Sequence, residues 1–361
     1  MSQNLFVVGP LLSQHIQVWF KHFTTTANVT VLTVHEGGKP LPEAMQKKVF
    51  SITGTRLDFF LFAPVFWLLW WWHRPVVTNF HYLSSYGLLS LLLPKRNLVL
   101  NVWGSDVNLP FKSKNKLKRF LIKKALQRYS WINAPAEHLK QKLIALGAAE
   151  EKIEVFQYGV NVNDLPIKAK ATDKAELIVV SNRNWQALYR IELIVAAFCL
   201  WQQQPDAPPA LLHLYGTGDN ADIARVNATL ARYPTAASRV TVMGYTDKDT
   251  MLQQMAQADI FVSVPERDGT PLSLLEAMYI GLLPVVSDID ANHEWLVANS
   301  ALWLTTYQPA ALAALLAQAV TTLASSNEWQ AVNRDKVAKL ADVNQNLPRF
   351  YAVLQRYIGD K

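Results

Sequence analysis

Short apolar runs alternate with longer amphipathic segments along most of the chain, as expected for strands and helices that follow one another. In the first half, one helix is predicted between the first two of six strands. The strands are Leu5 to Gly9, Val29 to Val34, Val76 to Phe80, Leu98 to Val102, Trp131 to Ala134 and Ile153 to Phe156, and the helix covers Gln14 to Phe23. This order of elements favours a parallel sheet.

The alternation starts again after the polar stretch Pro166 to Lys174, which is the predicted linker. The strands of the second half are Leu177 to Ser181, Ala210 to Tyr215, Val240 to Met243, Ile260 to Val264 and Leu283 to Ser287. Between them, helices are predicted over Ile191 to Gln202, Asp222 to Tyr233, Lys248 to Gln257 and Leu272 to Ile280.

The pattern therefore predicts an α/β protein with two Rossmann-like, doubly wound parallel-sheet domains, residues 1–160 and 161–345. A final amphipathic helix within residues 346–361 is expected to pack back on the first domain. Ligands of such sheets bind at the carboxyl ends of the strands, so a cleft between the two domains is expected.

The stretch from Val264 to Met278 combines a strand end, a loop and a helix start. Asp268-Gly269 ends the apolar run, Thr270 can act as N-cap, and Pro271 suits the first helical position. The helix that begins at Leu272 then offers backbone N–H groups and a partial positive charge to a phosphate.

Glu276 lies in this otherwise apolar helix, where a buried carboxylate without partners costs several kcal/mol. It must therefore meet hydroxyl groups or a cation, or else turn to solvent or pair with a nearby arginine. Asp268 has a comparable alternative, because Asp-Gly is a favoured turn pair.

The composition sets few further limits. The chain has 361 residues, half of them hydrophobic, which is enough for two domains with separate cores. Its single cysteine, Cys199, excludes an internal disulfide and suits the cytosol. No secretory signal is expected at Met1 to Gly9, and the apolar run Phe59 to Trp72 has 14 residues, fewer than the roughly 20 that span a bilayer.

Charge is distributed unevenly along the chain. Residues 1–160 hold 19 Lys/Arg against 8 Asp/Glu, whereas residues 161–361 hold 16 against 20, so the halves carry +11 and −4. Residues 111–128 contain eight cations and no acid, interleaved with apolar residues, which predicts a helix on an anionic membrane surface. The aromatic run Phe59 to Trp72 could add a wedge at the same face. The alternatives are a solvated helix for the charges and a buried helix for the aromatics. Nucleic-acid binding is not expected, because stacking aromatics are not spaced along the run.

The second half resembles the family 4 retaining glycosyltransferases of the GT-B fold, typical of bacterial polysaccharide and lipopolysaccharide synthesis. The resemblance is carried by Asp268 and Glu276, eight positions apart around a Gly-containing loop, with Asp in place of the family's first Glu. Segments in the family's order support it: Tyr158 to Asn161 as the interdomain hinge, Ser181 to Arg183, His213 to Gly218, Met243 to Tyr245 and Gly281 to Val286.

The resemblance implies transfer of a sugar from a nucleotide-diphospho-sugar, UDP-linked, to a lipid-linked or lipopolysaccharide glycan at the cytoplasmic face of the membrane. It implies no cofactor and no metal site, so the protein's own cations must stabilise the diphosphate. Asp268, Asp106 and Arg183 are the candidate catalytic residues. The donor-binding residues it implies are Arg183, Arg190, Gly216, Gly244, Tyr245, Gly269, Thr270, Leu272 and Glu276.

Three departures from the family pattern stand out. The Lys that usually follows the diphosphate Arg is missing, so Arg190 substitutes for it or nothing does. Trp103 occupies the position of the usual first-domain His, and Gly9-Pro10 replaces the Gly-rich turn. In the first domain, Asp106 is then either an acceptor-side carboxylate or a helix N-cap, and His81 after its strand is either similarly placed or structural. The departures leave a second hypothesis, a catalytically silent GT-B protein that acts as a membrane-bound partner in glycan assembly.

Overall fold

The computed structural model describes residues 4–11, 13, 16, 28–34, 45–50, 57–157, 159–168, 176–325 and 328–359. Two compact units divide the chain: unit 1 contains Met1–Tyr158 and Val343–Lys361, and unit 2 contains Gly159–Asp342. The predicted linker at 166–174 therefore lies within unit 2 as far as the described residues go, and residues 169–174 of it are outside them.

Unit 1 is built on a parallel sheet whose strand order is β3-β2-β1-β4-β5-β6-β7. Six of these strands were predicted, and the helix predicted over 14–23 lies almost entirely outside the described residues. Met45–Val49 was missed, because its sequence MQKKV has no apolar pattern. The strands are β1 Asn4–Val8, β2 Asn28–Thr33, β3 Met45–Val49, β4 Val77–His81, β5 Leu98–Asn101, β6 Trp131–Ala134 and β7 Ile153–Val155.

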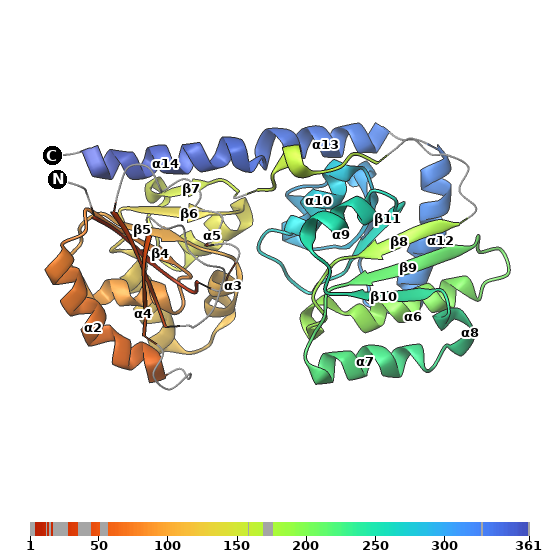
Figure 1. Cartoon of the computed structure of the whole chain (residues 1–361), viewed down its shortest axis with the longest axis horizontal. Coiled ribbons are helices and arrows are strands. Elements are labelled where there is room, and N and C mark those ends of the chain that lie inside the picture. The colour runs from red at the N-terminus through yellow and green to blue at the C-terminus, as the bar shows by residue number, and fades with distance from the viewer. Residues whose placement is uncertain are drawn as a thin grey trace. The chain divides into compact units, whose positions relative to one another are not determined.

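Helices cover both faces of this sheet (Figure 1). On one face, α2 (Leu57–His73), the 3-10 helix η1 (Tyr86–Leu92) and α4 (Lys116–Leu126) pack around Phe80 and Leu100. On the other, the C-terminal helix α14 (Val343–Gly359) packs its Phe350 and Leu354 against the strands. Two more helices, α3 and α5, cover Ser105–Lys112 and Glu137–Ala145.

The basic run at 111–128 is not one helix, as had been predicted. Helix α3 ends at Lys112, and α4 begins at Lys116 after a cap in which Asn115 accepts a hydrogen bond from the Lys118 N–H at 3.0 Å. The asparagine side chain competes for backbone N–H groups and so starts a new helix instead of continuing the old one.

Unit 2 contains a second parallel sheet, in the order β10-β9-β8-β11-β12-β13. Its strands are β8 Leu177–Ser181, β9 Ala210–Tyr215, β10 Val240–Gly244, β11 Ile260–Ser263, β12 Leu283–Ser287 and β13 Leu302–Leu304. Its helices are α6 Ile191–Gln202, α7 Asn220–Leu230, α8 Pro234–Ala237, α9 Lys248–Met255, α10 Leu272–Ile280, α11 Asp290–His293, α12 Pro309–Ser325 and α13 Glu328–Leu340. Apolar clusters lie on both faces, one with α6 and α12 and the other with α10 and α13.

Each sheet therefore has the doubly wound topology that the sequence predicted. The order along the sheet reverses between β1 and β4 in unit 1 and between β8 and β11 in unit 2. These reversal points are where such sheets bind ligands, at the carboxyl ends of the strands. Among the described residues no single helix is long and apolar enough to cross a membrane, although the bent pair Pro309–Ala324 and Glu328–Leu340 passes on length and composition.

The two points at which the chain passes between the units lie side by side within unit 2. The Val160 N–H donates to the Ala341 carbonyl at 2.8 Å, and Val160 also pairs with Asp342. Gly159 has a φ of +83°, and a Cβ on it would lie 1.9 Å from the Ala341 carbonyl oxygen. Only glycine fits this crossing.

Replacing Gly159 with alanine is expected to lower the free energy of unfolding by about 2 kcal/mol, because strained backbone and a clash add up. Urea denaturation measures this loss in the free energy of unfolding. The matched control is Gly244→Ala, which has a φ of +66° but nothing within 4 Å of the added Cβ. Equal losses in the two variants would show that the close approach to Ala341 contributes nothing.

Candidate active site

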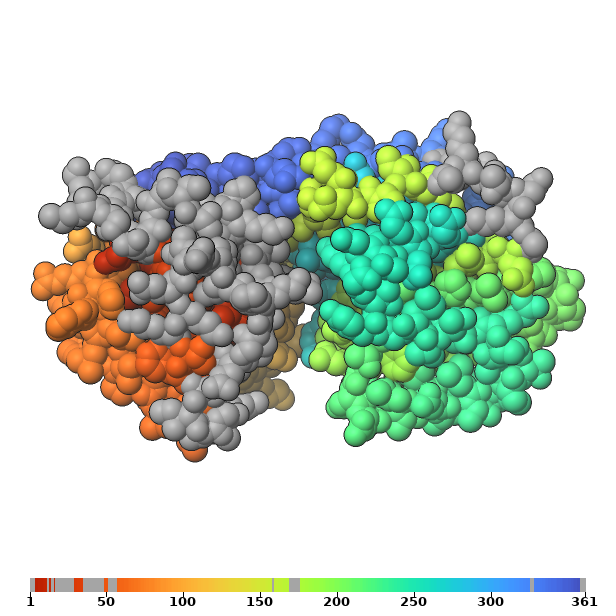
Figure 2. All heavy atoms as spheres, in the orientation of Figure 1, coloured from red at the N-terminus to blue at the C-terminus, as the bar shows by residue number. Residues whose placement is uncertain are grey.

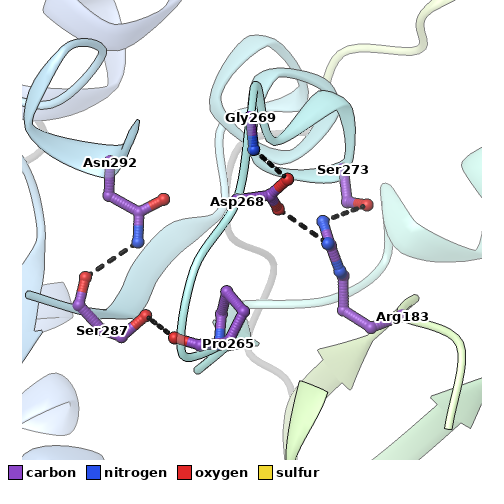
Figure 3. Close-up of polar contacts among 7 residues, drawn as sticks. All are labelled: Arg183, Pro265, Asp268, Gly269, Ser273, Ser287 and Asn292. Atoms are coloured by element: carbon purple, nitrogen blue, oxygen red, sulfur yellow. Dashed lines mark hydrogen bonds and ion pairs between the residues drawn. The ribbon is translucent and has the colours of Figure 1, made fainter. Parts of the chain in front are cut away.

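The candidate donor site lies where the order of the unit 2 sheet reverses. β8 and β11 are neighbours there, and the loops after them lead to helices on different sides of the reversal. Arg183 follows β8 by two residues, and Asp268 and α10 follow β11. Strand pairing thus brings together residues that are 85 positions apart in sequence (Figure 3).

Arg183 is held from three sides. Its Nη2 donates to Asp268 Oδ2 at 2.7 Å, its Nη1 donates to Ser273 Oγ at 3.2 Å, and its guanidinium lies 4.2 Å from the centre of the Tyr189 ring. Burial opposes the charge, but the Asp268 carboxylate and Tyr189 outweigh it and raise the pKa of Arg183. The site therefore contains a charged and oriented guanidinium.

Asp268 uses both of its carboxylate oxygens. While Oδ2 accepts from Arg183, Oδ1 accepts the Gly269 N–H at 2.8 Å, so the turn and the ion pair coexist. The start of this loop is fixed at the Pro265 carbonyl, which accepts from Ser287 Oγ at 2.8 Å and from the Tyr307 hydroxyl at 3.3 Å. The loop thus presents its carboxylate from a fixed base (Figure 3).

Helix α10 begins at Leu272 and ends at Ile280, as predicted, but its cap differs. Pro271, not Thr270, is the N-cap residue, and it makes no side-chain capping bond. In the tight turn before the helix, the Leu272 N–H donates to the Thr270 carbonyl at 3.0 Å. Since proline has no side-chain acceptor, no N-cap side chain covers the first turn of α10, which suits anion binding.

Glu276 is buried, with 6% of its surface exposed. Its Oε1 accepts from Lys248 Nζ at 2.8 Å, and its Oε2 lies 3.5 Å from the Asn182 side-chain nitrogen. The buried carboxylate therefore has a cation, one of the alternatives that the sequence left open, although Lys248 itself was not predicted. Nearby, Ser181 Oγ and Asn182 Oδ1 are buried polar atoms without a hydrogen-bond partner.

Arg190 belongs to a separate cluster in the same unit. Its guanidinium stacks on Tyr307 at 3.8 Å and lies 3.7 Å from Glu266 Oε2, while its Nη1 is buried without a partner. Its left-handed backbone, with a φ of +52°, forms the turn into α6. Arg190 makes no contact with Arg183, although the residue before it, Tyr189, stacks on Arg183.

Gly216 lies against the backbone of Arg183, where a side chain would not fit. With a φ of +84°, its Cβ position would lie 2.7 Å from the Arg183 carbonyl oxygen, and its N–H donates to the Gly244 carbonyl at 2.9 Å. Gly269 is buried and Thr270 half-buried in the loop before α10, whereas Tyr245 is 88% exposed beyond β10. Arg183, Gly216 and Gly244 thus lie at or just after the carboxyl ends of β8, β9 and β10.

In unit 1, Asp106 lies in the first turn of α3. The N-cap alternative for it is wrong, because Gly104 is the N-cap residue and no side chain makes a capping bond there. Asp106 is fully buried, and its oxygens accept the N–H groups of Leu83, Trp103 and Gly104 at 2.8, 2.9 and 2.8 Å. Burial raises its pKa despite these bonds. The carboxylate thus holds the backbone before the helix.

His81 lies at the end of β4 in a buried polar row that the sequence did not reveal. Its Nε2 is 3.2 Å from the Asn79 side-chain nitrogen, and the Asn101 amide donates to Asn79 Oδ1 at 2.6 Å. Asn133, one strand further on, is fully buried, and neither of its side-chain polar atoms has a partner. The Trp103 ring packs edge-on against Tyr82 at 5.5 Å. The signal was present, since each of three apolar strands contains an asparagine, and His81, Asn101 and Asn133 are at paired positions.

Within the described ranges, no group of three or more His, Cys, Asp or Glu side chains is placed to hold a metal ion. The positive charges near the Asp268 loop include those of Arg183, Arg190, Lys248 and Arg267, the last of which lies in the loop itself.

Comparison with known proteins agrees with this architecture. Residues 174–324 match the family described as "Glycosyl transferases group 1", and residues 7–134 match "Glycosyl transferase 4-like". No curated protein matches the chain significantly in sequence.

Several solved structures have a similar fold. Sucrose-phosphate synthase from Thermosynechococcus elongatus has a TM-score of 0.82 at 14% identity, covering 99% of this chain and 100% of its own. HepE from Anabaena, solved with UDP and glucose, has a TM-score of 0.77 at 12% identity and covers 98% and 100%. A glycosyltransferase from Rickettsia africae has a TM-score of 0.77 at 14% identity and covers both chains fully.

The two family matches, one in each unit, and the two doubly wound sheets define the class of protein. The chain is a glycosyltransferase with the GT-B fold.

Proposed function

We propose that the protein is a retaining glycosyltransferase that transfers a sugar from a UDP-sugar to a lipid-linked or lipopolysaccharide-type glycan. The observation that carries the donor part is the connected set of Arg183, Asp268 and Ser273 at the reversal point of the unit 2 sheet, with Glu276 in the same helix as Ser273. Proteins of similar fold have been solved with UDP, UDP-glucose or UDP-2-fluoro glucose, and one of them, trehalose-6-phosphate synthase, transfers with retention.

In this proposal each side chain has a separate task. Arg183 and the uncapped start of α10 neutralise the charge that develops on the diphosphate leaving group, which is the main electrostatic demand of the reaction. Glu276 accepts hydrogen bonds from the ribose hydroxyls, and Asp268 accepts a hydrogen bond from a hydroxyl of the donor sugar. Because Asp is one methylene shorter than Glu, the sugar must sit closer to this loop. No metal ion or cofactor takes part.

Unit 1 is then the acceptor-binding unit, and the protein works on the cytoplasmic face of the cytoplasmic membrane. The support for membrane association is the basic run 111–128, six of whose eight cations lie at the end of α3 or in α4. About 1 kcal/mol per basic residue near anionic lipid is enough for peripheral binding when several of them engage.

A thermal-shift panel of nucleotide sugars tests the proposal. UDP and UDP-sugars are expected to raise the melting temperature, whereas GDP- and ADP-sugars are expected to raise it less. Transfer to a lipid-linked acceptor, with the anomeric configuration read by NMR, then tests retention. If no nucleotide stabilises the protein, the donor assignment is wrong.

One observation favours a second candidate, a catalytically silent GT-B partner protein. The guanidinium of Arg183 is already neutralised by Asp268, and Trp103 stands where the family usually has a His. The silent protein would bind membranes without turnover. Hydrolysis of a nucleotide sugar that disappears in Arg183→Ala excludes it.

A further inference from the structure

Helix α2 exposes an unusual number of large apolar side chains. One stripe, Phe62, Phe66 and Trp70, is buried against the unit 1 sheet. The remaining surface is also apolar, and we call its seven residues the α2 ridge. The ridge consists of Leu57 (61% exposed), Phe60 (77%), Leu61 (47%), Trp67 (44%), Leu68 (60%), Trp71 (45%) and Trp72 (85%).

A helix that is apolar on all sides is normally buried on all sides. The α2 ridge is not, and it forms part of the orange outer flank of unit 1 (Figure 2). A continuous apolar surface of this kind marks a contact with another apolar phase, not with water.

The charges around the α2 ridge indicate which apolar phase it contacts. Residues 57–136 contain eleven Lys/Arg and only two acids, Asp58 and Asp106, both of which are buried. Nine of the eleven cations are exposed and the other two are partly exposed. The exposed charges of this region are thus all positive.

Helix α4 repeats this combination on the same face of the sheet. Both α2 and α4 pack into one apolar cluster with η1. On the outer side of α4, Leu117 (67% exposed) and Phe120 (55%) lie among lysines, and Lys124 Nζ is 5.6 Å from the Phe120 ring centre. Apolar side chains flanked by exposed cations are the pattern of helices that lie in a membrane interface.

We propose that the α2 ridge inserts into the interface of an anionic lipid bilayer, with α4 binding the headgroups beside it. The ridge adds an apolar anchor to the electrostatic association proposed above for 111–128, and it rests on that association but not on sugar transfer. Three exposed tryptophans suit the interface, where their amphipathic rings are favoured. With 17 residues, α2 is about 25 Å long, shorter than the roughly 30 Å hydrocarbon core, and one side is packed on unit 1, so it lies in the membrane plane.

A second copy of the chain is the other apolar partner to consider. A symmetric dimer would place the same patch on both sides of the contact, and therefore two cationic surfaces without exposed acids against each other. Anionic lipid has the opposite charge, so the charge pattern favours the bilayer.

Vesicle flotation of the full-length protein tests the proposal. Wild type is expected to float with vesicles of phosphatidylcholine and phosphatidylglycerol in equal parts, and to keep part of its binding in high salt. The ridge variant Phe60→Ser/Leu68→Ser/Trp72→Ser is expected to bind about tenfold more weakly per side chain removed. Its residual binding disappears in high salt, since only the charges remain. The charge variant Lys116→Gln/Arg119→Gln/Lys123→Gln is expected to bind more weakly in low salt, with a smaller loss of binding in high salt than wild type shows.

The matched control is Val297→Ser/Val332→Ser, two half-exposed apolar residues of unit 2, which is expected to bind vesicles as wild type does. Relative to wild type, quenching of tryptophan fluorescence by brominated lipid should fall in the ridge variant but not in this control. All replaced ridge residues are at least 60% exposed, so circular dichroism should confirm that the variant folds.

Two results would overturn the proposal: a wild type that does not float, or a ridge variant that floats as wild type does in high salt. A wild-type dimer that the ridge variant makes monomeric, without vesicle binding, would assign the surface to self-association instead. Loss of UDP binding in all variants would count against the proposed function and leave the membrane result unaffected.

Discussion

Arg183→Ala is expected to lower kcat/KM for a UDP-sugar by about 10²–10³, the usual effect of removing one preorganised charge donor. The guanidinium is oriented by Asp268, Ser273 and the Tyr189 ring before any substrate arrives, so little reorganisation is needed when the leaving group develops charge. Steady-state kinetics measure the effect. Arg183→Lys keeps the charge but not the planar group that contacts two partners at once, and should recover only part of the rate.

The same substitution also affects folding, which must be separated from catalysis. Removing Arg183 leaves the Asp268 carboxylate, whose side chain is 15% exposed, without its cation, at a cost of up to about 3 kcal/mol. The double variant Arg183→Ala/Asp268→Asn removes both charges and should regain most of that stability without regaining turnover. Arg239→Ala, which breaks an exposed ion pair with Glu176 in the same unit, is the control expected to change neither quantity. Full activity in a folded Arg183→Ala protein would remove Arg183 from the donor site.

The elements that carry this site were predictable from sequence for a simple reason. Leu272–Ile280 and Leu283–Ser287 are continuous apolar segments bounded by proline and glycine, and their bounds in the structure are the predicted ones. The strand Met45–Val49 carries two lysines and no apolar run, and it pairs only with β2 at the edge of the sheet. Charged edge strands avoid unwanted pairing, but they give no periodic signal.

The contacts within the site were less predictable, because they depend on which strands are neighbours. The pairing of β8 with β11 puts Arg183 against Asp268, and nothing in the local sequence of either loop specifies it. Lys248 could not be singled out, since a lysine in the first turn of α9 is ordinarily solvated. Asp106 was open to two roles in the sequence, and neither of them predicted that its carboxylate binds three backbone N–H groups before α3.

Glu276→Gln is expected to weaken UDP binding by about tenfold to a hundredfold, because a hydrogen bond to a charged group contributes about 1.5–3 kcal/mol. The change keeps the size of the side chain and removes only its charge, so α10 should still pack. Isothermal titration calorimetry with UDP measures the loss. Glu266→Gln is the matched control: its side chain is 51% exposed and pairs with Arg190 outside the Glu276 pocket. Equal affinities of the Glu276→Gln variant and wild type would contradict the assignment of the ribose to this carboxylate.

Before a nucleotide binds, Lys248 is the cation that pairs with the Glu276 carboxylate. Its Nζ lies 2.8 Å from Oε1, but its side chain is 58% exposed, so it can leave when ribose hydroxyls compete for the same oxygen. An exposed cation of this kind contributes about 0–1 kcal/mol, and Lys248→Met should therefore change the Kd of UDP by no more than about fivefold. If Lys248→Met instead loses as much affinity as Glu276→Gln, the lysine must contact the nucleotide itself. It would then be a further donor-site cation in addition to Arg183.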